Sequence, residues 1–124
     1  LFCIEASPYW RTHYVPGAAG DELPKRLGTF KARIIGINLV AVLQFAYGSR
    51  TGDERLRDSA QSLLERLPSE DNRFMRAWSG EGVPIRNAFE SQALLQLATE
   101  YCARTRCAEC PVGRRIAAHT DNPK

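Results

Sequence analysis

The chain has 124 residues and a formal net charge of +3, with 44% hydrophobic and 25% charged residues. This length suits a single domain, and the composition excludes a disordered chain, a collagen-like repeat and a low-complexity polymer. The longest apolar run, residues 34–47, is shorter than the roughly 18 residues that a membrane span needs. We therefore expect a cytoplasmic protein that does not bind a membrane.

The pattern of turn residues and apolar residues predicts an all-α fold. We expect a compact bundle of about four helices over residues 29–103, after an irregular, aromatic-rich arm over residues 1–28. A Cys-rich loop and basic tail follow over residues 104–124. The chain begins at Leu1, with no initiator Met and no recognisable signal segment, so we expect the carboxy-terminal piece of a longer protein.

The arm shows no helical periodicity, and its prolines and glycines are typical of loops. Tyr9, Trp10 and Tyr14 lie within six residues of one another. Large aromatic side chains bury much apolar area, so we expect them to pack over the helical core and to anchor the arm.

The first long helix is predicted from Phe30 to about Tyr47, with Thr29 as its N-cap and Gly48 as its stop. The middle of this segment is apolar nearly all round, which is typical of a central helix covered by others. A second, amphipathic helix is predicted to begin after Asp53 and to end before Pro68.

Two further helices and a short turn complete the predicted fold. Ser69 opens a helix that reaches about Ser79. Asn87 and Glu90 form a variant of the capping box, at the start of a helix from Ala88 to about Ala103. One last helical turn is expected over residues 114–119.

Three cysteines lie within nine residues, directly after the last long helix. Cys102, Cys107 and Cys110 are spaced C-x4-C-x2-C, and thiolates at such spacing can share one tetrahedral ion. The sequence therefore predicts a structural zinc site, with an iron–sulfur cluster as the alternative. His119 is the favoured fourth ligand. Cys3, His13 and a residue outside the chain are the other candidates for that position.

Other interpretations of these cysteines stay open. They can be unmetallated thiols, or the four cysteines can form two disulfides. A thiol nucleophile such as Cys102 with His13 as its base is a third alternative. No Gly-rich phosphate loop, serine-hydrolase elbow or zinc-protease motif is present, so we do not expect this chain alone to be an enzyme.

Basic residues accompany the cysteines. The tail carries Arg104, Arg106, Arg114 and Arg115 against few acidic residues. Such a cluster indicates either a solvated surface or a surface that faces the phosphates of a nucleic acid.

Six strings occur in register with a known family. They are EASPYWRTHY, LPKRLG, INLVAVLQFAYG, LLERLPSEDN, SQALLQL and YCARTRCAECPVG. Over about Glu5 to Gly113, the chain resembles the carboxy-terminal part of the bacterial domain of unknown function 2851. The resemblance implies that Cys102, Cys107 and Cys110 fall on that family's cysteine cluster, and that Cys3 lies outside it.

The resemblance also implies a role for the chain within a longer protein. The amino-terminal half of the family's members loosely resembles nucleases of the restriction-endonuclease type. We therefore expect a helical accessory domain with a Cys-bound metal, which assists the nucleic-acid binding of its parent protein. The alternative is a non-catalytic scaffold without metal, which packs on the missing amino-terminal half. An exposed apolar patch would favour that alternative.

Overall fold

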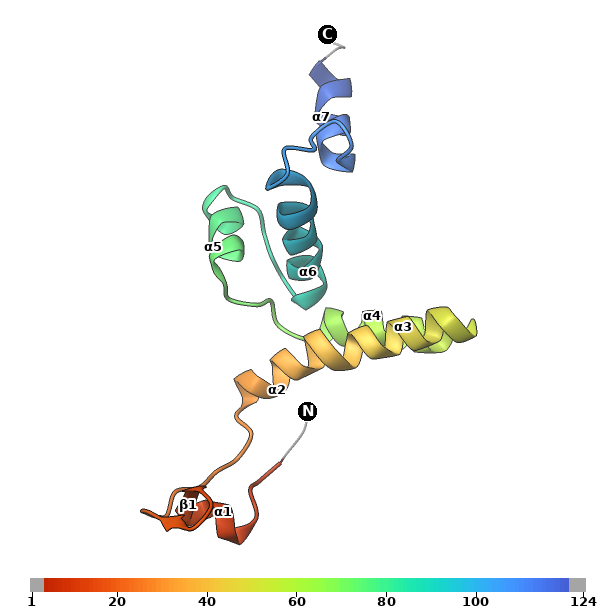
Figure 1. The fold of residues 1–124 in the computed structure, drawn as a ribbon. Helices are drawn as coiled ribbons and strands as arrows, with labels where there is room; N and C mark the ends of the chain where they lie inside the picture. The colour runs from red at the N-terminus through yellow and green to blue at the C-terminus, as the bar shows by residue number, and fades with distance from the viewer. Residues whose placement is uncertain (1–3, 121–124) are drawn as a thin grey trace. The chain divides into compact units, whose positions relative to one another are not determined.

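The computed structural model describes residues 4–120. It divides into two compact units, which meet in the sequence between Leu63 and Leu64. Helices form most of the chain, as expected from the sequence, and one two-stranded hairpin lies near the N-terminus (Figure 1). Each unit is described by itself below.

The N-terminal arm has more local structure than its sequence predicts. A short helix, α1 (Pro8–Thr12), is followed by strands β1 (His13–Val15) and β2 (Ala18–Ala19), which pair antiparallel. Gly17 lies in the turn between the strands with a φ of 78°, a conformation that glycine adopts without strain. Strands this short leave no alternation pattern, so the periodicity of the sequence did not predict them.

Backbone pairing closes the base of the arm. Glu5 and Arg26 form an isolated antiparallel bridge. Beside it, the Ala6 amide donates to the Lys25 carbonyl at 2.7 Å, and the Leu27 amide donates to the Ile4 carbonyl at 2.8 Å. The arm is therefore a loop whose two ends are held together by main-chain hydrogen bonds.

The aromatic residues of the arm pack on one another. The Tyr9 ring stacks on His13 with centroids 4.0 Å apart, and it meets Trp10 edge-on at 5.0 Å. Tyr9, Trp10 and Tyr14 nevertheless remain 46%, 40% and 71% exposed. This exposure differs from the expectation that these rings pack over a helical core.

One continuous helix spans Thr29–Thr51 in the first unit. It consists of α2 (Thr29–Ile35), a π-helical segment η1 (Gly36–Ala41) and α3 (Val42–Thr51). Its N-cap is Gly28 rather than Thr29. Its end also differs from the prediction, because the helix continues through Gly48 to Thr51.

Gly48 supports helix packing and does not stop the helix. A Cβ at this position would lie 2.8 Å from the Asp53 carbonyl oxygen and 3.0 Å from the Leu56 Cβ. Glycine therefore allows α3 to approach the start of α4 (Glu54–Arg66) closely. The stop comes at Gly52 instead, which has the left-handed φ of 73° typical of a residue that ends a helix. Asp53 caps α4 as predicted, since its Oδ1 accepts from the Arg55 amide at 3.0 Å.

In the second unit, α5 (Arg73–Gly80) begins four residues later than predicted. Its N-cap is Asn72, whose Oδ1 accepts from the amides of Phe74 at 3.0 Å and Met75 at 3.1 Å. An asparagine that satisfies two helix-end donors fixes the start of the helix more strongly than Ser69, which lies outside it.

The last long helix matches its predicted bounds. It comprises α6 (Ala88–Gln96) and a second π-helical segment, η2 (Leu97–Cys102). The Asn87 Oδ1 accepts from the Glu90 amide at 3.0 Å, as a capping box requires. The Glu90 carboxylate in turn accepts a hydrogen bond from the Arg86 amide at 2.7 Å. Arg86 lies one residue before the N-cap.

Helices α5 and α6 contact each other in the second unit (Figure 1). Met75 is 4% exposed, and Ser91 is fully buried. The Ser91 hydroxyl donates to the Ala88 carbonyl at 3.0 Å and accepts from the Glu70 amide at 3.4 Å, so its burial leaves no polar atom unpaired. The final helix, α7 (Pro111–Thr120), is longer than the single turn that the sequence predicts.

Candidate functional site

The predicted metal ligands lie between the end of η2 and the last turn of α7. Cys102 ends η2 and is exposed, Cys107 is exposed within the turn, and Cys110 is buried directly before α7. His119 lies near the end of α7 with an exposed side chain. We call residues 102–110 the cysteine loop.

Main-chain hydrogen bonds hold the cysteine loop. The Arg106 amide donates to the Tyr101 carbonyl at 2.9 Å. The Cys110 amide is shared between the carbonyls of Arg106 at 3.1 Å and Cys107 at 3.3 Å. Thr105 has a φ of 51°, in the left-handed region that non-glycine residues seldom adopt. These bonds hold the chain in tight turns between η2 and α7.

Gly113 fits the start of α7 against the cysteine loop. A Cβ on Gly113 would lie 2.2 Å from the Cys107 carbonyl oxygen, so only glycine is compatible with this approach. The Arg114 amide donates to the Cys110 carbonyl at 2.9 Å and continues the helix from the loop. The cysteine loop and the first turn of α7 are therefore closely packed and joined by a main-chain hydrogen bond.

The cysteines do not converge on a metal site in this structure. Over residues 4–120, no three side chains of His, Cys, Asp or Glu come together in a way that could hold a metal ion. Cys3, one candidate for the fourth ligand, lies outside the described residues. His13 is in the arm, where its Nδ1 is 2.9 Å from the Tyr9 carbonyl oxygen and 3.0 Å from the Thr12 hydroxyl. A Cys-bound zinc ion or iron–sulfur cluster stays a prediction.

Two of the four predicted basic residues are paired with carboxylates. Arg104 lies 3.3 Å from Glu100, and the Arg106 guanidinium forms an ion pair with Glu109. The hydrogen bond from Arg106 and its charge hold the pKa of Glu109 below its usual value. Arg114 and Arg115 are exposed near the start of α7. The charge around the cysteine loop is thus partly neutralised by neighbouring acids.

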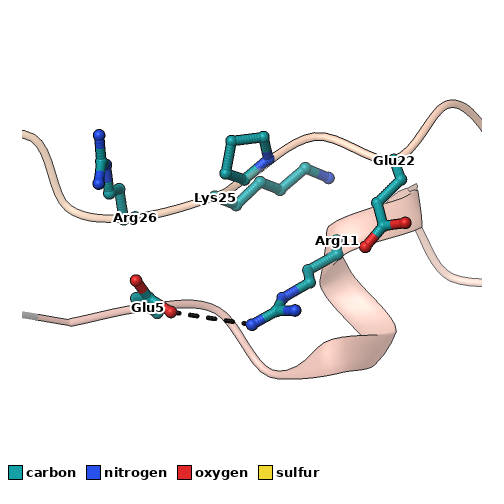
Figure 2. A pocket seen from close by; sticks show the side chains of 6 residues that line it. Glu5, Arg11, Glu22, Lys25 and Arg26 are labelled. Atoms are coloured by element: carbon teal, nitrogen blue, oxygen red, sulfur yellow. Dashed lines mark ion pairs between the residues drawn. The ribbon is translucent and has the colours of Figure 1, made fainter.

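A polar cavity lies in the N-terminal arm, at residues that the sequence analysis did not single out. It measures about 430 Å³, and its charged lining comprises Glu5, Arg11, Glu22, Lys25 and Arg26. Figure 2 shows Arg11 extending from α1 toward Glu5, with 3.8 Å between the paired atoms. No sequence signal could have found this cavity, because the bridge between Glu5 and Arg26 joins residues far apart in the chain.

Two of the three cations that line this cavity, Lys25 and Arg11, have partners within the arm. The Lys25 ammonium donates to the His13 carbonyl at 2.5 Å and lies 3.4 Å from the centroid of the Tyr14 ring. Arg11 pairs with Glu5. Charges of both signs line the cavity, whereas small-molecule sites are mostly apolar with a few convergent polar groups. The cavity therefore does not by itself indicate a ligand.

The helix Thr29–Thr51 presents two different faces. Its buried face carries mostly small residues: Ala32, Gly36, Ile37, Ala41 and Gly48. Larger apolar residues recur on the other side at the i, i+3, i+4 and i+8 spacing of a helical stripe. We call this set the outer stripe: Leu39, Val42, Leu43 and Tyr47. Its members are 52%, 56%, 58% and 62% exposed.

This exposure differs from the central helix that the sequence predicts, because the apolar side chains are not covered all round. The helix also meets, by length and composition, the criteria for a membrane span, with 23 residues and a mean hydropathy of 1.3 in its most apolar window. This helix is longer than the apolar run of residues 34–47 that it contains. A core helix of a water-soluble protein and a signal sequence meet the same criteria.

A comparison with protein families matches residues 1–73 to the family described as protein of unknown function (DUF2851). The match covers more than half of the 124 residues. The chain belongs to this family. The match to DUF2851 ends before the cysteine loop, so the placement of the three cysteines on a family cluster stays a prediction. No curated protein and no solved structure matches this DUF2851 chain.

Proposed function

We propose that the chain is a non-catalytic helical scaffold of a larger DUF2851 protein, and that it packs against the rest of that protein through the outer stripe. The observation that carries this proposal is the exposure of Leu39, Val42, Leu43 and Tyr47, each more than half exposed. Soluble proteins seldom leave contiguous apolar surface open unless something binds it. Fully burying a side chain of this size contributes about 1.5–3 kcal/mol.

The two-sidedness of the helix favours a protein partner over a membrane. The face with the small buried residues approaches α4 at Gly48, so another part of this chain already contacts that face. Asn38 and Gln44 interrupt the apolar sequence in the middle of the helix, and the Asn38 side chain donates to the Ile34 carbonyl at 3.2 Å. A helix with one small-residue side and one large-residue side suits a position between two protein layers.

The nucleic-acid role predicted from the tail has less support. Arg104 and Arg106 engage Glu100 and Glu109, which leaves Arg114 and Arg115 as the arginines that favour phosphate contacts. Two exposed arginines are a small electrostatic footprint for a nucleic-acid surface. The outer stripe is the stronger of the two signals.

The test is a substitution within the outer stripe of the natural full-length protein. We expect Leu43→Asp to lower the free energy of unfolding by at least about 2 kcal/mol, because docking would bury an unpaired carboxylate. Ser49→Asp, on the same helix and also exposed, is the matched control and should change stability by no more than about 0.5 kcal/mol. Thermal and urea unfolding give both values.

Two results would contradict the scaffold proposal. Equal, small effects of Leu43→Asp and Ser49→Asp would mean that the outer stripe stays in water. Co-sedimentation of the wild-type protein with phosphatidylcholine vesicles, abolished by Leu43→Asp, would instead assign the stripe to a lipid surface.

A further inference from the structure

The cysteine loop places Cys107 and Cys110 at the two ends of one hydrogen-bonded turn. Cys107 and Cys110 occupy the first and last positions of a turn closed by the hydrogen bond from the Cys110 amide to the Cys107 carbonyl, at 3.3 Å. The end residues of such a turn have Cα atoms less than about 7 Å apart. Disulfides span Cα distances of roughly 4.4–6.8 Å, so this pair can be bridged with little movement of the backbone.

The two thiols differ in their access to solvent. Cys107 is exposed, whereas Cys110 is 5% exposed. A disulfide-bearing reagent can therefore reach Cys107 directly. Cys110 is shielded from such a reagent, yet the turn holds it beside Cys107. In thiol–disulfide exchange, an exposed thiol such as that of Cys107 attacks the reagent. A neighbouring thiol such as that of Cys110 then resolves the mixed disulfide.

The surroundings fix the turn in place. Gly113 packs against the main chain of Cys107, and Cys110 directly precedes the first residue of α7. A cysteine pair fixed by a helix start and a close backbone contact loses little further freedom when a bond forms between the sulfurs. The third thiol, Cys102, is exposed but lies before the turn, at the end of η2.

We propose that Cys107 and Cys110 form a reversible disulfide by thiol–disulfide exchange with low-molecular-weight disulfides of the glutathione class. The Cys107 thiolate attacks one sulfur of the reagent, forms a mixed disulfide and releases the first small thiolate. The Cys110 thiolate then attacks the Cys107 sulfur and releases the second. Two electrons pass from the protein dithiol to the reagent, and the two protons of the protein thiols end on the two released thiols.

This assignment is independent of the scaffold proposal, because it uses neither the outer stripe nor a docked partner. It also suits a cytoplasmic protein, where disulfides are usually transient and serve redox sensing. The loop would then switch between a dithiol and a bridged form.

The first experiment exposes the purified full chain to oxidised glutathione and maps its cysteines by peptide mass spectrometry. We expect the peptide that holds Cys107 and Cys110 to lose the mass of two hydrogen atoms, and to regain it in reduced glutathione. Cys102→Ser should close this bridge as the wild type does. A bridge that requires Cys102 or Cys3, or no bridge at all, would overturn the proposal.

Two variants separate the roles of the thiols. Cys110→Ser should stop at a stable mixed disulfide on Cys107, formed within about twofold of the wild-type rate. Cys107→Ser should react at least about tenfold more slowly in this segment, because its remaining thiol is buried. Equal rates for the two variants would contradict the assigned order of attack.

A metal measurement on the unmodified protein closes the test without relying on any variant. Elemental analysis of anaerobically purified protein should find substoichiometric zinc and iron, with Cys107 open to alkylation. One equivalent of metal with Cys102, Cys107 and Cys110 all protected from alkylation would overturn the disulfide proposal and support the metal site instead.

Discussion

Two helices, Thr29–Thr51 and Ala88–Cys102, each contain a π-helical segment, yet different interactions determine them. The helix Thr29–Thr51 begins after Gly28 with no side-chain hydrogen bond at its N-cap, and its larger apolar residues are exposed. The helix Ala88–Cys102 begins with a bond from the Glu90 amide to Asn87 and buries the paired Ser91.

This difference separates packing from local hydrogen bonding as determinants of a helix. The first helix depends on what lies against its small residues and, in our proposal, on what covers its outer stripe. The second is defined at its start by side chains close in sequence. Substitutions at local capping positions should therefore affect the two helices unequally, and substitutions at close contacts should affect the first helix most.

The largest effect is expected from Gly48→Ala. Alanine is the better helix former by about 1 kcal/mol, but its Cβ would lie 2.8 Å from the Asp53 carbonyl oxygen. Overpacking of this kind costs about 1–3 kcal/mol, so we expect a lower free energy of unfolding in urea. Gly80→Ala is the control, because no atom lies within 4 Å of its added Cβ, and it should leave stability unchanged or raised. Similar results for both variants would contradict the claim that Gly48 is needed for the close approach of α3 and α4.

A smaller effect is expected at the helix starts. Asn87→Ala removes the acceptor of the Glu90 amide and should cost about 1 kcal/mol. Thr29→Ala, at the start of the first helix, should change stability by less than about 0.5 kcal/mol, because the N-cap there is Gly28 without a side-chain bond. Urea unfolding of the two variants checks the comparison directly. An equal loss in both would mean that Thr29 caps its helix after all.

The helix boundaries differ in the same way in how far the sequence alone predicts them. Two helix starts, at Asp53 and Asn87, are predicted correctly, because the hydrogen bonds that define them span only two or three residues. The prediction of Gly48 as a helix stop is wrong, because the role of Gly48 depends on its contact with Leu56 in the following helix. The prediction of Ser69 as a helix start is wrong, because Asn72 makes the hydrogen bonds that cap the helix.

The candidate sites were predictable only in part. The spacing of the cysteines identified the loop, but not that Cys107 and Cys110 share a hydrogen-bonded turn with one thiol exposed and the other buried. Likewise, the apolar content of residues 34–47 indicated a helix, but not which side of it would be covered. Burial depends on contacts between distant residues, which neither periodicity nor spacing encodes.

The smallest predicted effect concerns pH and the capping box of the second long helix. The side-chain hydrogen bond from Arg86, helped by its backbone bond, lowers the pKa of Glu90 below the usual 4.5. The ionised carboxylate therefore stabilises the fold above that usual pKa, and the contribution is lost as the pH falls through the lower pKa of the folded state. NMR titration of Glu90 should give this lowered pKa, and about 1 M salt should move it back toward the usual value, since the pair is exposed. Glu90→Gln keeps an oxygen acceptor without the charge, so its stability should fall less than that of the wild type between neutral and acidic pH. An unchanged acid response would show that the Arg86–Glu90 pair adds nothing to the capping provided by Asn87.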